Sequence, residues 1–139
     1  MAQNYDQLPA LIAAGFDWED SLVYALLYEG AVFDSTHQRA HQVGQWIKRE
    51  PLQGRFITDT GEWAGQPALF YMVTPDHTYQ MVLGYDDGEH NELLLAFYGE
   101  NTAGEPLQVA RRGSLFVRPA SEEIGSPPSY GIWLTPGLA

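Results

Sequence analysis

The sequence predicts an α+β fold, with two or three N-terminal helices packed on one face of an antiparallel meander of about five strands. Two observations lead to this prediction. Apolar residues recur at helical spacing up to about residue 50, and from Gly54 onward they follow a period of two. The helical region also precedes the strand region as a block, whereas a parallel doubly wound sheet would alternate helices with strands.

The length of 139 residues predicts a single domain over 1–139. Its helical part is expected over about 5–50, its sheet part over about 54–118, and a Pro/Gly-rich tail over 119–139. At this size roughly two-thirds of the surface of the unfolded chain can be buried, so a core can form without disulfide bonds.

The chain has no cysteine. This excludes a disulfide scaffold, thiolate zinc sites, iron–sulfur clusters and cysteine nucleophiles, and it favours a cytoplasmic location. No apolar run reaches the roughly 18 residues that a membrane helix needs. The first residues also lack the basic region of a secretory signal. We therefore expect a cytoplasmic protein that does not bind membranes.

Three segments have the pattern of helices. Residues 5–14 predict a short helix that ends at Gly15. The next helix is expected to follow Asp17 and to end at Gly30. Its apolar residues at 22, 23, 26 and 27 indicate the central buried helix of the fold. A third helix is expected from about Ser35 to Arg49, before Pro51.

Short strands are expected over 55–58, 68–74, 78–85, 92–98, 107–111 and 115–118, with 132–134 as an edge strand or a flap. The segment 68–74 is apolar on both faces, which is typical of a central strand. Residues 86–91 have hairpin chemistry, and 58–67 is a turn-rich connection. Alternation predicts one shared face in each of two strands. These faces comprise Tyr79, Met81, Leu83 and Tyr85 in the first strand, and Leu93, Leu95 and Phe97 in the second.

The charge balance is uneven. Only 18% of residues are charged, yet the net charge is -11, because the chain has seven Lys and Arg residues against eighteen acids. Between Phe56 and Ala110 there is no Lys or Arg. A negative field of this kind repels phosphate backbones and anionic membranes, and it attracts basic partners. The acids in this stretch are Asp59, Glu62, Asp76, Asp86, Asp87, Glu89, Glu92, Glu100 and Glu105.

No motif identifies a reaction, and the sequence predicts no catalytic residue, cofactor or metal ligand. It contains neither a glycine-rich phosphate loop nor a G-x-S-x-G elbow. His37 and His41 have the spacing of two zinc ligands on one helix face, but Gln38 stands where a metalloprotease has Glu. Two surface histidines beside an apolar stripe are the other interpretation. The acidic loop over 86–92 lacks the spacing of an EF-hand.

Aromatic residues accompany the acids. Trp63 lies in the turn-rich segment, where no core is evident, and tyrosines lie on the expected strands. Tyr and Trp beside carboxylates suit Arg and Lys side chains through cation–π contacts and charge-assisted hydrogen bonds. The residues that we expect to bind a partner are Trp63, Asp76, Tyr85, Asp86, Asp87, Glu89, Glu92, Glu100 and Glu105.

We therefore predict a non-catalytic acidic binding protein that inhibits a basic protein, such as a toxin or a nucleic-acid enzyme, by occluding its positive surface. Bacterial immunity proteins and phage-encoded inhibitors of defence nucleases share this physical profile, and no closer resemblance is implied. Two alternatives stay open. One is a small-ligand-binding protein or enzyme with a pocket between helices and sheet, and the other is a phage or secretion-system assembly component. Replacing Asp86 and Asp87 by Lys is expected to disturb binding and to leave folding nearly intact.

Overall fold

The computed structural model describes residues 2–74, 77–89, 91–99, 107–108, 115–117 and 131–134. Its largest sheet is antiparallel throughout. The strands in spatial order are β1 (Ala2–Asn4), β8 (Leu93–Tyr98), β7 (Thr78–Tyr85), β2 (Val23–Glu29) and β3 (Lys48–Pro51), and β9 (Leu107–Gln108) pairs with one end of β7.

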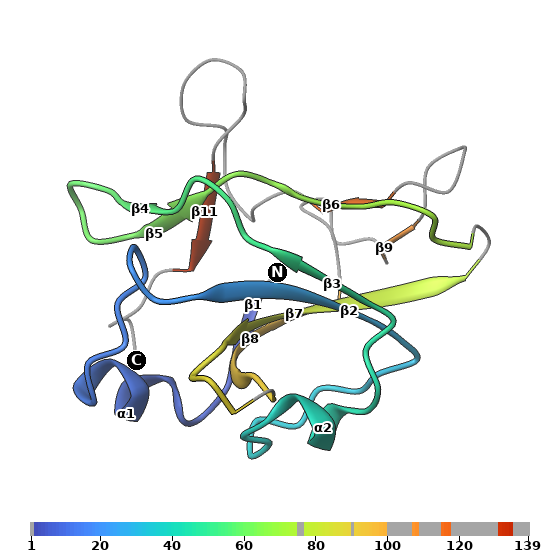
Figure 1. Cartoon of the computed structure of the whole chain (residues 1–139), viewed down its shortest axis with the longest axis horizontal. Helices are drawn as coiled ribbons and strands as arrows, with labels where there is room; N and C mark the ends of the chain where they lie inside the picture. The colour runs from blue at the N-terminus through green and yellow to red at the C-terminus, as the bar shows by residue number, and fades with distance from the viewer. Residues whose placement is uncertain are drawn as a thin grey trace.

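Two smaller antiparallel sheets form a second layer. One has the order β11 (Gly131–Leu134), β5 (Trp63–Gly65) and β4 (Phe56–Ile57), and the other pairs β10 (Leu115–Val117) with β6 (Ala68–Phe70). In Figure 1 these strands lie above the large sheet, and the helix α2 (Ala40–Val43) lies below it. The large sheet is therefore covered on both faces.

The segment expected to be the central helix is the strand β2, so the predicted α+β arrangement of packed helices on a meander is wrong. Val23, Ala25 and Leu27 belong to the core between the sheets, whereas Leu26 and Tyr28 belong to a second apolar cluster on the opposite face. A strand buried on both faces is a continuous apolar run, and its spacing resembles that of a buried helix.

The helix expected over 35–49 is also wrong in most of its length. Only the four residues of α2 are helical; the chain then passes through Gly44 at φ 143° and enters β3. Positive φ is strained for residues with a Cβ, so Gly44 ends the helix well before Pro51. The short first helix is confirmed as α1 (Leu8–Ala13), which ends before Gly15 at φ 105°. Neither helix in the described segments is long or apolar enough to span a membrane.

The turn-rich connection contains a strand that the sequence did not predict. All three residues of β5 are buried, and β5 is the middle strand of its sheet. The apolar segment 68–74 contributes only β6, in a two-stranded sheet, so it is not a central strand. Residues 132–134 lie within β11, which is an edge strand as one of the two expectations had it.

The hairpin of β7 and β8 is confirmed, but its faces differ from the simple alternation. Tyr79, Met81 and Leu83 share the core between the sheets, as expected. On β8, however, Leu95 faces that core and Phe97 faces the opposite cluster. The register shifts between Leu83 and Gly84, where a bulge adds one residue to β8 and reverses the alternation beyond it.

Replacement of a β2 side chain tests the two-faced burial. Leu26 is 0% exposed, so Leu26→Ala should lower the free energy of unfolding by about 2–5 kcal/mol, through lost burial and a residual cavity. Leu22 is 56% exposed just before the strand, and Leu22→Ala should change stability by only about 0.5 kcal/mol. Urea unfolding of both variants measures the difference, and equal losses would contradict this assignment of the core.

Candidate functional site

The acidic loop between β7 and β8 is held by an arginine from the segment before α2. The Arg39 Nη2 atom lies 3.0 Å from Asp87 Oδ2 and 3.3 Å from Glu89 Oε2. The same guanidinium donates to the backbone carbonyl of Asn91 at 2.7 Å. Two of the acids expected to attract a partner therefore surround a cation of their own chain.

A second arginine, from the edge strand β3, engages the other two acids. The Arg49 Nε atom lies 2.5 Å from Glu92 Oε1, and its Nη2 lies 3.0 Å from Asp86 Oδ2. Its guanidinium carbon sits 3.5 Å from the centre of the Tyr24 ring, which adds a cation–π contact. Glu92 is only 2% exposed, and in the described residues it is the one buried charged side chain. A carboxylate in such a position needs a paired cation.

The buried position of Glu92 depends on a glycine across the hairpin. A Cβ atom built on Gly84 would lie 2.7 Å from the Glu92 Cβ, closer than side-chain carbons approach in proteins. Gly84 therefore makes room for the carboxylate that binds Arg49. This site of close approach lies at the β-bulge, where glycine is a frequent residue.

These ion pairs make the acids of the 86–92 loop partners of arginines in the same chain rather than free surface charges. The hydrogen bond from Arg39 and its positive charge lower the pKa of Asp87. Lysines at positions 86 and 87 would lie beside Arg39 and Arg49, so the expectation that this double replacement leaves folding nearly intact no longer holds. The four described acids of the loop act first as internal partners of two arginines.

The aromatic residues expected at the interface lie in the core or at its margin. Trp63 is 6% exposed, and its ring stacks on Trp18 with centroids 5.1 Å apart. Tyr85 is half-buried, with its ring 4.9 Å from that of Phe16. The remaining expected contact residues, Asp76, Glu100 and Glu105, lie outside the described residues.

The two spaced histidines do not share a helix face, because α2 begins only at Ala40. His37 Nε2 lies 3.6 Å from Asp34 Oδ2, whereas the His41 ring nitrogen Nδ1 is hydrogen-bonded to Asn91. No group of three or more His, Cys, Asp or Glu residues is arranged for a metal ion within the part of the chain that the structure describes.

A group of acids, all exposed except the half-buried Glu62, lies elsewhere, and we call it the acidic end. The loop before β2 packs on the β4–β5 hairpin, because the Trp18 indole stacks on Trp63 and donates to the Ala64 carbonyl at 2.9 Å. Figure 1 shows this loop rising toward β4 and β5. None of the acids at this end forms an ion pair with a described Lys or Arg. They are Asp17, Glu19, Asp20, Asp59 and Glu62.

An arginine lies beside the acidic end with its guanidinium turned inward. Arg55 donates to the backbone carbonyls of Trp18, Ser21 and Leu52. Burial lowers the pKa of Arg55, whereas Asp17 and Asp20 act in the opposite direction, so both carboxylates lie within its electrostatic reach. This group could not be foreseen from the sequence, because the segment after Asp17 was expected to be a helix and is instead a loop up to Val23.

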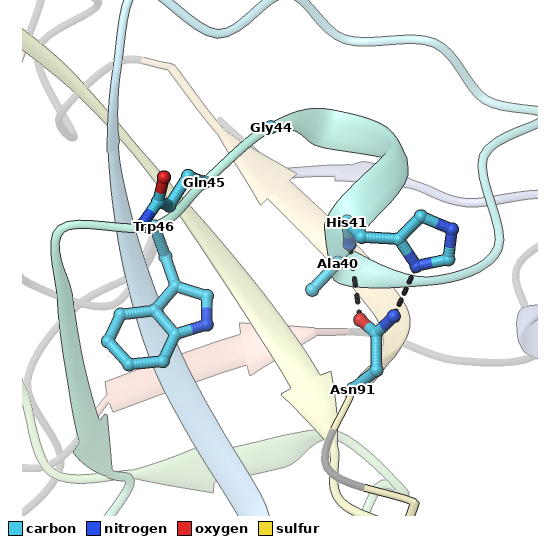
Figure 2. A pocket seen from close by; sticks show the side chains of 6 residues that line it. All are labelled: Ala40, His41, Gly44, Gln45, Trp46 and Asn91. Atoms are coloured by element: carbon cyan, nitrogen blue, oxygen red, sulfur yellow. Dashed lines mark hydrogen bonds between the residues drawn. The ribbon is translucent and has the colours of Figure 1, made fainter.

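A hollow of about 460 Å³ lies between α2 and the loop that leads to β3 (Figure 2). Two bonds fix α2 on the sheet: the Ala40 N–H donates to the Glu92 carbonyl at 2.9 Å, and the Tyr28 hydroxyl donates to the Ala40 carbonyl at 3.1 Å. Because residues 35–49 were expected to form one continuous helix, the sequence offered no indication of this hollow. Its lining residues are Ala40, His41, Gly44, Gln45, Trp46 and Asn91.

A second hollow, of about 620 Å³, lies beside β1, and Phe33, Gln80 and Phe97 are among its lining residues. Neither hollow brings a nucleophile within reach of a general base. The geometry of the described residues thus offers surfaces and hollows for binding, without an arrangement that identifies a reaction.

No protein-family model, curated protein or solved structure matches this chain.

Loss of the cation beside Glu92 should destabilise the fold. Arg49→Ala leaves a buried carboxylate without its partner, and because Arg49 itself is 27% exposed, we expect a loss near the low end for buried pairs, about 3 kcal/mol. Glu89 is 69% exposed at the other end of the network, and Glu89→Ala should cost about 0.5 kcal/mol or less. Chemical unfolding measures both. A loss below about 1 kcal/mol for Arg49→Ala would show that Glu92 does not depend on it.

The pKa of Asp87 reports the second ion pair. Arg39→Gln should raise this pKa toward its ordinary value, because the charged hydrogen bond that favours the carboxylate is removed. Because the pKa of Asp87 is lower in the folded state than in the unfolded state, its ionised carboxylate stabilises the fold at pH values above the unfolded-state pKa. This stabilisation is lost as the pH falls through the folded-state pKa. Carboxyl NMR titration of both proteins gives the two values, and an unchanged Asp87 pKa would rule out the pairing in solution.

Proposed function

We propose that this chain is a non-catalytic binding protein that occludes a basic surface on another macromolecule, with the acidic end as its contact region. A toxin or a nucleic-acid enzyme is the class of partner whose working surface carries this charge. The proposal moves the contact away from the 86–92 loop, since its described acids are already paired within the chain.

The observation that carries the proposal is the unbalanced negative charge of the described surface. The described segments contain thirteen Asp and Glu residues against four Lys and Arg residues. Three of those four cations are committed to internal partners, namely Arg39, Arg49 and Arg55. The carboxylates outside these pairs therefore determine the field that an approaching molecule meets.

The acidic end is suited to contact because its two parts are held together. The loop before β2 and the β4–β5 hairpin share the stack of Trp18 on Trp63, so the acids on them keep their relative positions. A preorganised set of carboxylates binds cations without a further loss of conformational freedom. Association with a basic partner should then be fast at low salt and slower as salt screens the charges over about 10 Å.

Charge reversal at the acidic end tests the proposal. In Glu19→Lys with Asp20→Lys, two exposed acids become cations, and retention of a partner from a native-host lysate should be lost. Asp6→Lys with Glu50→Lys makes the same change of net charge at two acids outside both the acidic end and the ion pairs of Arg39 and Arg49, and should retain it. The captured protein must be basic, and its association rate must fall with salt. A neutral or acidic partner, a salt-independent rate, or equal losses in the two variants would contradict the proposal.

An assembly component is a second candidate, favoured by exposed apolar side chains. Val32, Tyr71 and Met72 are 78%, 62% and 86% exposed. Tyr and Met are enriched in protein interfaces relative to the rest of the surface. If they mediate self-association, sedimentation velocity should show concentration-dependent oligomers that Met72→Ser with Tyr71→Ser removes. A monomer at all accessible concentrations would exclude self-association through Tyr71 and Met72.

A further inference from the structure

The strand β1 forms one border of the large sheet, and no strand in the described segments pairs with its outer edge. The Tyr5 N–H donates to the Leu95 carbonyl at 3.2 Å, so by alternation the backbone groups of Gln3 also face β8. Those of Ala2 and Asn4 therefore face outward in strand geometry. The opposite border, β3, carries three charged residues, whereas β1 carries none. An uncharged free edge is a template for a further strand.

The 620 Å³ hollow lies against this edge. Gln3 at the middle of β1 belongs to its lining, and so does Phe97, which stands opposite Gln3 on β8. The Phe33 ring, 5.5 Å from the Phe97 ring, adds a second aromatic group, and Val32 beside it is 78% exposed. The free edge and the hollow therefore share a residue and form one continuous surface.

A strand added antiparallel to β1 would place one of its side chains at the hollow. Directly opposite residues of two antiparallel strands point to the same face, so the residue opposite Gln3 lies on the face of the hollow. Its two neighbours exchange backbone hydrogen bonds with Ala2 and Asn4. In strand addition, backbone bonds supply affinity and pockets for alternate side chains supply specificity. The rings of Phe33 and Phe97 favour an aromatic side chain in this pocket.

The charges near this edge favour a basic peptide. The Ser35 Oγ donates to Asp6 Oδ2 at 3.1 Å, which brings Asp34 and Asp6 to the same end of β1. Hydrogen bonds from the side chain and the backbone of Thr36 lower the pKa of Asp34, so this carboxylate stays ionised at neutral pH. All lining residues of the hollow come from 1–38 and 56–110, two stretches without Lys or Arg. Opposite charge attracts and orients a partner.

We propose that β1 and the adjoining hollow bind an extended peptide that carries an aromatic residue between Lys or Arg residues. The peptide adds antiparallel to β1, with its aromatic side chain opposite Gln3. A second copy of this chain is a poorer occupant, because its own β1 would present only Ala, Gln and Asn to the hollow. The site shares no residue with the acidic end, so it stands or falls independently of the proposed contact there.

The probe is the capped peptide acetyl-Lys-Thr-Thr-Phe-Thr-Thr-Lys-amide, followed by amide NMR of the full chain. Saturable shifts are expected at Gln3, Asn4, Phe33 and Phe97, with a dissociation constant on the order of 0.1–1 mM for so short a peptide. Replacing its Phe by Ser should weaken binding about tenfold or more, through lost apolar burial. N-methylation of the two threonines beside Phe should abolish binding, because it removes the N–H groups that β1 accepts.

Two variants of the chain test the same edge. Asn4→Pro removes an N–H that faces outward and keeps the hydrogen bonds of β1 to β8, so binding should weaken about tenfold. Asn4→Ala keeps that N–H and should bind as the native chain does. In about 0.15 M salt, where distant charges are screened, Glu19→Lys with Asp20→Lys should leave the peptide affinity unchanged. A loss in that variant would place the peptide at the acidic end and overturn the proposal.

Four other results would overturn it as well. The first is the absence of a saturable shift at β1 and the hollow with the Phe peptide. The second is equal binding of the Ser or N-methylated peptide, which tests the native chain even if Asn4→Pro does not fold. The third is equal affinity of Asn4→Pro and Asn4→Ala. The fourth is a concentration-dependent shift at β1 without peptide, which would assign the edge to a second copy of the chain.

Discussion

Glu92 is the residue through which the large sheet, its edge strand and α2 are connected. Its carboxylate pairs with Arg49 on β3, and its backbone carbonyl accepts a hydrogen bond from the Ala40 N–H of α2. Its Cβ lies so close to Gly84 on β7 that a side chain at position 84 would collide with it. A buried carboxylate is costly unless it is paired, so this position constrains the residues on three other elements at once. The hollow beside α2 therefore depends on an ion pair that lies outside it.

The acidic sequence has two different structural uses. In the loop that joins β7 to β8, carboxylates hold Arg39 and Arg49 and so attach the hairpin to its neighbours. At the acidic end, carboxylates lie on two segments joined by the stack of Trp18 on Trp63, without an ion-paired cation among the described residues. Net charge alone does not distinguish these uses, because the distinction depends on which arginines fold back onto which loop.

The strand β7 could be predicted from the sequence, because its large apolar residues Tyr79, Met81 and Leu83 recur with a period of two, although Val82 on its other face is buried as well. The strand β2 could not, since burial on both faces removes the alternation and leaves a run that equally fits a helix. Phe97 was assigned to the wrong face because a bulge is a local event without a reliable sequence signal. The stack of Trp18 on Trp63 joins residues distant in sequence, so no local pattern indicated that Trp63 is buried.

The residues of the edge strand β3 affect whether the protein can aggregate through strand pairing at high concentration. Its Leu52 neighbour donates a backbone hydrogen bond to Val23 at 2.9 Å, so by alternation the nitrogen of Pro51 faces away from β2. Proline has no hydrogen there to offer, and Lys48, Arg49 and Glu50 surround the same border with charge. A strand from another molecule could not form a complete set of hydrogen bonds with β3 and would meet charged side chains there. This edge therefore disfavours the intermolecular strand pairing that leads to fibres.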